Sequence, residues 1–174
     1  MIRSHLDQLE FKGKWKDAVQ LAFDEKNSVI AMSRSVFYGW YLPLESFCIE
    51  PEPEEDIIEL AHECLVEIFP KSLSSDSPDI LREIGYGMNI AGYLFPGNSD
   101  ENDKLYTDIL KRAVELEPEC PLSIELYNGS LKKGPLLHNP LSNSEWSEYI
   151  DRRFPSDGEY DSYYRSVLRN RVVV

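Results

Sequence analysis

The densest local group of reactive residue types is the tripeptide His62-Glu63-Cys64. An imidazole, a carboxylate and a thiol could together supply a base, an orienting group and a nucleophile. The tripeptide lacks the HExxH spacing that places two histidines on one helical face for zinc. On a helix, Cys64 falls on the apolar face, whereas His62 and Glu63 fall on the other face. We therefore expect a core thiol beside a solvated surface, and no catalytic role.

Other sequence patterns that carry chemistry are absent. The stretch GYGMNIAG does not follow the GxGxxG pattern, and neither GxxxxGK[ST] nor GxSxG occurs. The three cysteines, Cys48, Cys64 and Cys120, have no CxxC spacing, so the sequence indicates neither a disulfide framework nor a zinc site. We predict that the chain is not an enzyme and that it uses no cofactor and no metal.

Carboxylates are concentrated in two short segments. The first could in principle bind a hard cation, but it lacks the alternating ligands and central glycine of an EF-hand loop. It is also suited to begin a helix, because the positive end of the helix dipole attracts carboxylates. We interpret both segments as candidate surface for a basic partner. The candidate partner-binding residues are Glu52, Glu54, Glu55 and Asp56 in the first segment and Asp100, Glu101 and Asp103 in the second.

The net charge supports a basic partner and argues against an anionic one. The 174 residues include 31 Asp and Glu and 18 Lys and Arg, for a net charge of −13. All of the excess lies within residues 50–119, which hold 18 acids and five bases, while the flanks are balanced. Such a field repels nucleic acids and anionic membranes and attracts basic proteins. The alternative is that the acidity only aids solubility.

The segments that would position these carboxylates and the tripeptide mostly show the apolar spacing of α-helices. One apolar stripe runs from Ile57 to Ile68, and we expect that helix to end at Pro70. A second apolar segment, SVIAMSRSVFYGWYL, predicts a helix that ends before Pro43. Further helices are predicted in KWKDAVQLAFDE, in SPDILREIGYGMNIAGYLF and over residues 102–117.

Two late segments follow the capping-box pattern of a helix start. These are SNSE at Ser142–Glu145 and SDGE at Ser156–Glu159, each before an aromatic-rich stretch. Strand signals are confined to the terminal VVV (Val172 to Val174) and short pieces. The sequence therefore predicts an all-α fold: a single domain over residues 1–174, with about seven or eight helices packed as antiparallel hairpins.

Two segments resemble parts of the tetratricopeptide repeat. GKWKDAVQLA, from Gly13, is similar to the inter-helix turn and second helix of a repeat, and ILKRAVELEP is similar to its last turns. In that pattern a small Ala lets helices approach and a Pro ends the second helix. The two segments are not separated by the 34-residue period, and Pro96-Gly97 interrupts the helix that a full repeat requires. The resemblance implies a helical scaffold that binds a peptide or protein, without a repeat array.

In overall type, this small, acidic and helical chain resembles the immunity proteins of bacterial toxin systems. The resemblance implies a cytoplasmic protein that neutralises a cognate basic toxin by occluding its active site. No segment has the pattern of a signal peptide or the length of a membrane span, so we expect a soluble protein. Immunity function is our first hypothesis, and the tetratricopeptide-like scaffold is the alternative. If the acidity serves solubility only, the interface is expected on apolar surface, for instance near Trp146 and Tyr149.

Overall fold

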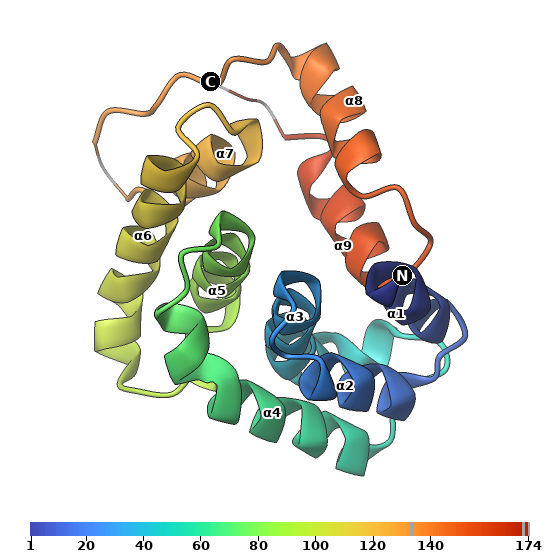
Figure 1. Ribbon diagram of the computed structural model, residues 1–174. Coiled ribbons are helices and arrows are strands. Elements are labelled where there is room, and N and C mark those ends of the chain that lie inside the picture. Colours follow the sequence, from blue (N-terminus) through green and yellow to red (C-terminus); the bar gives the residue numbers. More distant parts are fainter. Residues whose placement is uncertain (133, 172, 174) are drawn as a thin grey trace.

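The computed structural model shows a chain of helices joined by short loops (Figure 1). It describes residues 1–132, 134–171 and 173, and the side chains of Ser99, Asp100 and Asp103 lie outside this description. Within these residues there are nine α-helices, two 3-10 turns and no strand, which confirms the predicted all-α fold. In chain order the elements are α1 (Ile2–Phe11), α2 (Trp15–Asp24), α3 (Val29–Glu45), η1 (Ser46–Cys48), α4 (Glu55–Leu73), α5 (Pro78–Ala91), η2 (Gly92–Leu94), α6 (Ser99–Leu116), α7 (Pro121–Ser130), α8 (Asn143–Arg153) and α9 (Glu159–Leu168).

The structure contains more helices than the seven or eight predicted, because α1 and α7 were not recognised. In α7, the consecutive residues Leu122 to Leu126 are all buried. A helix that is buried all round shows no alternation of apolar and polar faces, so periodicity cannot reveal it. In α1, Leu6 and Leu9 face the core, but the segment is short and most of its other residues are polar.

The predicted helix ends at Pro43 and Pro70 are wrong, since both prolines lie inside the last turns of α3 and α4. A proline there removes one hydrogen bond from a single turn. The residues before the prolines, Leu42 and Phe69, are buried in the core, and this packing keeps the chain helical. The carbonyl of Pro70 also accepts a hydrogen bond from Ser74 Oγ at 3.1 Å.

Helix α3 occupies the middle of the molecule, with α5 beside it (Figure 1). Every residue from Ala31 to Leu42 is buried. Helix α4 packs antiparallel to α3: Gly39 faces Leu65 near the middle of both helices, and Lys71 Nζ donates to Asn27 Oδ1 at 2.6 Å near their ends. The buried apolar side chains form one continuous cluster, so the core belongs to a single domain.

A second antiparallel hairpin is formed by α5 and α6. An added Cβ on Gly85 would lie 2.5 Å from Leu110 Cγ, so this glycine permits the close approach of the two helices. Arg82 near the start of α5 pairs with Glu117 just beyond the end of α6, with Nη1 and Oε2 2.8 Å apart. The predicted arrangement as antiparallel hairpins is therefore confirmed for α3–α4 and α5–α6.

One of the two predicted capping boxes is present. Ser142 is the N-cap of α8: its Oγ accepts from the Glu145 N–H at 3.4 Å, and Glu145 Oε2 accepts from the Ser142 N–H at 2.9 Å. The box predicted at Ser156 is wrong, because α9 begins at Glu159 with Gly158 as its N-cap. There, Asp161 instead of Glu159 reaches back and accepts from the Ser156 N–H at 2.9 Å.

The Ser142→Ala substitution tests this cap. It removes an acceptor from the first turn of α8, so we expect the free energy of unfolding to fall by about 0.5–2 kcal/mol in urea denaturation. Ser156→Ala is the matched comparison, because within the described residues Ser156 Oγ accepts a single long hydrogen bond, from Gly158 N at 3.3 Å. A loss for Ser156→Ala as large as that for Ser142→Ala would contradict the assignment of the caps.

The Gly39→Ala substitution tests the contact between α3 and α4. A Cβ at residue 39 would overlap the Cβ of Leu65 and lie 2.9 Å from the Ala61 carbonyl oxygen. We expect a loss of about 1–3 kcal/mol, measured by the same denaturation. Gly92→Ala is the control, because an added Cβ there would have no neighbour among the described side chains nearer than Asn102 Cβ at 3.9 Å. If both variants keep wild-type stability, the two helices are not packed this closely.

Candidate functional site

The first acidic segment lies on the surface at the start of α4. Glu54 is the N-cap of this helix, and Glu55 and Asp56 lie in its first turn, where carboxylates are favoured. Together with Glu52, these residues are exposed. Asp56 lies 4.0 Å from Lys16 Nζ, a contact between two exposed side chains that leaves the carboxylate accessible. The predicted helix start is confirmed, and the four carboxylates are free to meet a partner.

The second acidic segment lies in the first turns of α6. Glu101 is exposed, whereas the side chains of Asp100 and Asp103 lie outside the described residues. Asn102 is buried, and its Nδ2 donates to the carbonyls of Gly92 and Phe95 at 3.0 and 3.3 Å. In Figure 1 the starts of α4 and α6 lie on opposite sides of the view. The structure thus does not join the two segments into one patch.

Helix α4 carries further acids that the sequence interpretation did not select. Glu55, Glu59, Glu63 and Glu67 recur every four residues, so they follow one another along one side of the helix, and all four are exposed. We call these four residues the α4 acidic row. The four-residue spacing was visible in the sequence, but only the local density of acids was considered.

The α4 acidic row is not explained by pairing within the molecule. Glu67 Oε1 lies 2.9 Å from Lys26 Nζ. Glu59 and Glu63 form no ion pair with any other residue that the structure describes. Like charges four residues apart repel and disfavour a helix by a few tenths of a kcal/mol per pair. The chain therefore keeps a negative surface that costs a little stability.

Apolar surface lies next to the α4 acidic row. His62 Nε2 lies 2.9 Å from the carbonyl oxygen of Leu94, and this hydrogen bond holds the η2 turn against α4. In that turn Tyr93 is 69% exposed, and on α4 itself Val66 is 45% exposed. A partner that approaches the carboxylates would therefore also meet Val66, and Tyr93 is exposed on the turn that His62 holds against this helix.

The reactive tripeptide is not assembled into a site. Cys64 faces the core, where burial raises the pKa of its thiol to about 11, so the reactive thiolate is scarce near neutral pH. Glu63 faces solvent and His62 binds a backbone carbonyl. Across the described part of the chain, no three His, Cys, Asp or Glu side chains are grouped closely enough to hold a metal ion. No described helix is long and apolar enough to cross a membrane.

The alternative apolar surface near Trp146 does not exist. Trp146 is fully buried, and its Nε1 donates to the Leu168 carbonyl at 2.8 Å. Tyr149 is partly buried and stacks on Trp146 with ring centroids 5.8 Å apart. These rings hold α8 against α9, so they are core residues and the expected exposed interface is wrong here.

A second candidate site is a pocket where the two ends of the chain meet, which the sequence interpretation did not identify. It has a volume of about 220 Å³ and receives side chains from α1, α3, α5, α9 and the end of α8. We call it the charged pocket. Its lining consists of Arg3, Val29, Ile30, Ser33, Arg34, Asp79, Arg153, Phe154 and Tyr160.

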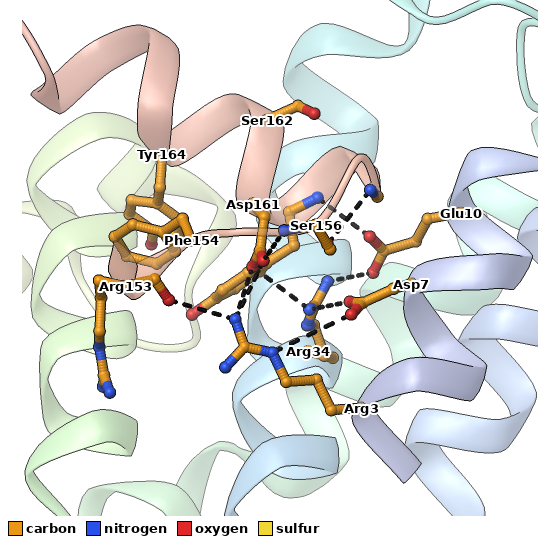
Figure 2. Close-up of polar contacts among 12 residues, drawn as sticks. Arg3, Asp7, Glu10, Arg34, Arg153, Phe154, Ser156, Asp161, Ser162 and Tyr164 are labelled. Carbon is orange, nitrogen blue, oxygen red and sulfur yellow. Dashed lines mark hydrogen bonds and ion pairs between the residues drawn. The ribbon is translucent and has the colours of Figure 1, made fainter. Parts of the chain in front are cut away.

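The floor of the charged pocket is a buried cluster of ion pairs (Figure 2). Arg34 is 2% exposed, and its guanidinium pairs with Glu10 and Asp7 of α1. Asp161 of α9 lies 3.6 Å from Arg34 Nη2 and 3.0 Å from Arg3 Nη2. A buried guanidinium needs such partners, because removal of one leaves an uncompensated charge. The cluster therefore ties both chain ends to the central helix.

A second buried carboxyl lies behind the pocket, on α5. Glu83 is 2% exposed and accepts hydrogen bonds from the hydroxyls of Tyr160 and Tyr164, both at 2.8 Å, and from Trp40 Nε1 at 3.2 Å. Burial raises the pKa of Glu83 to about 7, and the three hydrogen bonds oppose that shift. This carboxyl therefore changes its protonation state near neutral pH.

Comparison of the chain with protein-family models, with curated proteins and with solved structures found no match.

The raised pKa of Glu83 predicts a pH dependence of stability. Because the folded protein holds this proton up to about pH 7, whereas the ordinary value is 4.5, the folded state binds more protons between these values. The contribution is fully present below pH 4.5 and is lost as pH rises to about 7, by roughly 3 kcal/mol. We expect Glu83→Gln to abolish this part of the fall in denaturation midpoints measured from pH 5 to 8.

The matched control is Glu63→Gln, which neutralises an exposed carboxyl on another helix. Burial also raises the pKa of Glu10, and that residue is present in the wild type and in both variants, so the difference between curves isolates Glu83. Parallel pH profiles for the wild type and Glu83→Gln would contradict a shifted pKa at this carboxyl.

Proposed function

We propose that the chain is a protein-binding immunity protein, which neutralises a cognate basic toxin domain by covering its active site. The observation that carries this proposal is the α4 acidic row. The row spans thirteen residues, from Glu55 to Glu67, and rises about 18 Å along the helix. Exposed carboxylates along that length form a linear negative surface, which is complementary to a positively charged groove.

The charge of the row would act mainly on the rate of encounter. Opposite charges steer two proteins together before they touch, and they also reject partners of the same sign. A toxin that acts on nucleic acid presents a basic surface to phosphates, and the carboxylates of the row would compete for that surface. The small loss of helix stability from like charges is compensated when the partner's cations lie between them.

Apolar contacts beside the row would slow dissociation of the complex. Binding energy in protein interfaces is concentrated in a few aromatic and aliphatic anchors, whereas exposed charges contribute less. Val66 is exposed on α4 itself, and Tyr93 is exposed on the η2 turn that His62 fixes against α4. We assign steering to the row and anchoring to these two side chains.

The alternative is a tetratricopeptide-like scaffold that binds a peptide or protein partner. The hairpins α3–α4 and α5–α6 support it, since such scaffolds stack helical hairpins. However, the charged pocket has a volume of about 220 Å³, below the roughly 300–1,000 Å³ of common ligand sites. A pocket of that size does not suit an extended peptide, so we favour the acidic row as the binding surface.

The proposal is tested with the product of the reading frame next to this gene. Co-expression of the chain should restore growth that the neighbouring protein arrests. Glu63→Lys should slow association with that protein by about three- to tenfold in stopped-flow measurements, with less effect on dissociation. The wild-type association rate should also fall as salt rises, since exposed charges are screened beyond about 10 Å at 0.1 M.

Glu148→Lys is the matched control, because it makes the same change of charge at an exposed position on α8. It should leave the association rate close to that of the wild type. Equal rates for Glu63→Lys and the wild type at all salt concentrations would mean that the row serves solubility only. A neighbouring protein that does not arrest growth would contradict immunity function.

A further inference from the structure

A buried hydroxyl without a partner lies in the wall of the charged pocket. Ser33 on α3 is 6% exposed, and its Oγ forms no hydrogen bond within the described structure. Buried polar atoms are nearly always satisfied, since an unmet one costs about 1–3 kcal/mol. A serine in a helix can satisfy itself by donating to the carbonyl four residues earlier, but Ser33 does not. Solvent does not reach this Oγ, so a ligand atom would meet the hydroxyl only after the Ser33 side chain rotates about χ1 towards the pocket.

The two arginines at the rim of the pocket, Arg3 and Arg153, have N–H donors that no described residue uses. Arg3 uses Nη2 for Asp161 and for the Arg153 carbonyl, and Arg153 uses Nη2 for Asp79. Neither Nη1 donates to any other residue within the described structure, and the two side chains are 39% and 38% exposed. Figure 2 shows Arg153 extending away from the Asp161 cluster. Each guanidinium therefore presents a free N–H edge.

The lining has an excess of positive charge. It includes three guanidiniums and a single carboxylate, Asp79, which already pairs with Arg82 at 2.5 Å and with Arg153. The acids beneath the pocket are engaged with Arg34 and Arg3. The first turn of α3, which lines the pocket through Val29 and Ile30, adds the positive end of a helix dipole. Because Asp79 and the acids beneath the pocket balance the charge of the guanidiniums, an anion would be held here by directed hydrogen bonds from the unused N–H groups of Arg3 and Arg153 and not by a net positive field.

The rest of the wall is apolar. Val29 and Ile30 are 41% and 40% exposed at the mouth, and the rings of Phe154 and Tyr160 complete the lining. The volume of about 220 Å³ limits the occupant to a small molecule. A suitable ligand has an acidic head and a short hydrocarbon part.

We propose that the charged pocket binds a small organic carboxylate. Its oxygens accept hydrogen bonds from the free edges of Arg3 and Arg153 and from Ser33 Oγ, and its apolar part lies against Val29 and Ile30. Charge-assisted hydrogen bonds from guanidinium to carboxylate are among the stronger polar contacts in proteins. This site is separate from the α4 acidic row and does not depend on the proposed function.

Hexanoate is a suitable probe, and hexanamide is its neutral analogue of similar shape. Titration of the labelled protein with hexanoate, followed by amide chemical shifts, should give saturable changes confined to the residues that line the pocket. Hexanamide should bind at least tenfold more weakly, because it lacks the charge. Absence of saturable changes with hexanoate, or equal binding of hexanamide, would overturn the proposal.

The substitutions Ser33→Ala and Ser35→Ala form a matched pair. Both residues are buried serines of α3 whose hydroxyls have no partner in the described structure, but Ser35 does not line the pocket. Ser33→Ala should weaken hexanoate binding by about two- to tenfold, the value of one hydrogen bond. Ser35→Ala should leave it unchanged, and both variants should fold, because no hydrogen bond is lost. An equal effect of the two substitutions, or none for Ser33→Ala, would assign the hydroxyl no role in binding.

Discussion

The structure depends on a guanidinium placed inside its central helix, α3 (Figure 1). Arg34 lies within a run of α3 that solvent scarcely reaches, so its charge must be compensated inside the protein. The compensating carboxylates come from α1 at one end of the chain and from α9 at the other. Loss of one partner of a buried ion pair typically costs about 3–5 kcal/mol, so this contact requires the two ends to converge on α3.

The need to compensate the charge of Arg34 also organises the part of the core around α9. Glu10 accepts from the Tyr38 hydroxyl and from the Tyr160 N–H, the latter at 3.1 Å, so one carboxylate links α1, α3 and α9. The Tyr160 ring lies 3.9 Å from the Arg34 guanidinium carbon, which adds a cation–π contact. Tyr38 and Tyr160 therefore have a structural role. The charged pocket is the gap that remains where these helices meet.

Local pattern was enough to predict much of the fold but little of the charged pocket. Apolar periodicity located α2 to α6, and the SxxE pattern located the start of α8. Prediction from local pattern failed where a helix is buried all round, as in α7, and where packing overrides a proline, as at Pro43. An arginine inside an apolar segment indicates a buried ion pair, but the sequence does not identify its partners. Two of them lie 24 and 27 residues earlier, on α1, and the third lies on α9. Such contacts follow from the tertiary fold. By contrast, the α4 acidic row follows from spacing alone and could have been predicted.

Helix α3 separates α4 from α9 (Figure 1), so a partner on the α4 acidic row leaves the charged pocket open. The central claim is that α4 is the partner-binding surface. Hydrogen–deuterium exchange of the chain, alone and bound to the protein from the neighbouring gene, tests it most directly. The account predicts that binding slows exchange in α4 and η2 and leaves the first turn of α3 and residues 153–160 unchanged. Slowed exchange confined to residues 29–33 and 153–160 would contradict it.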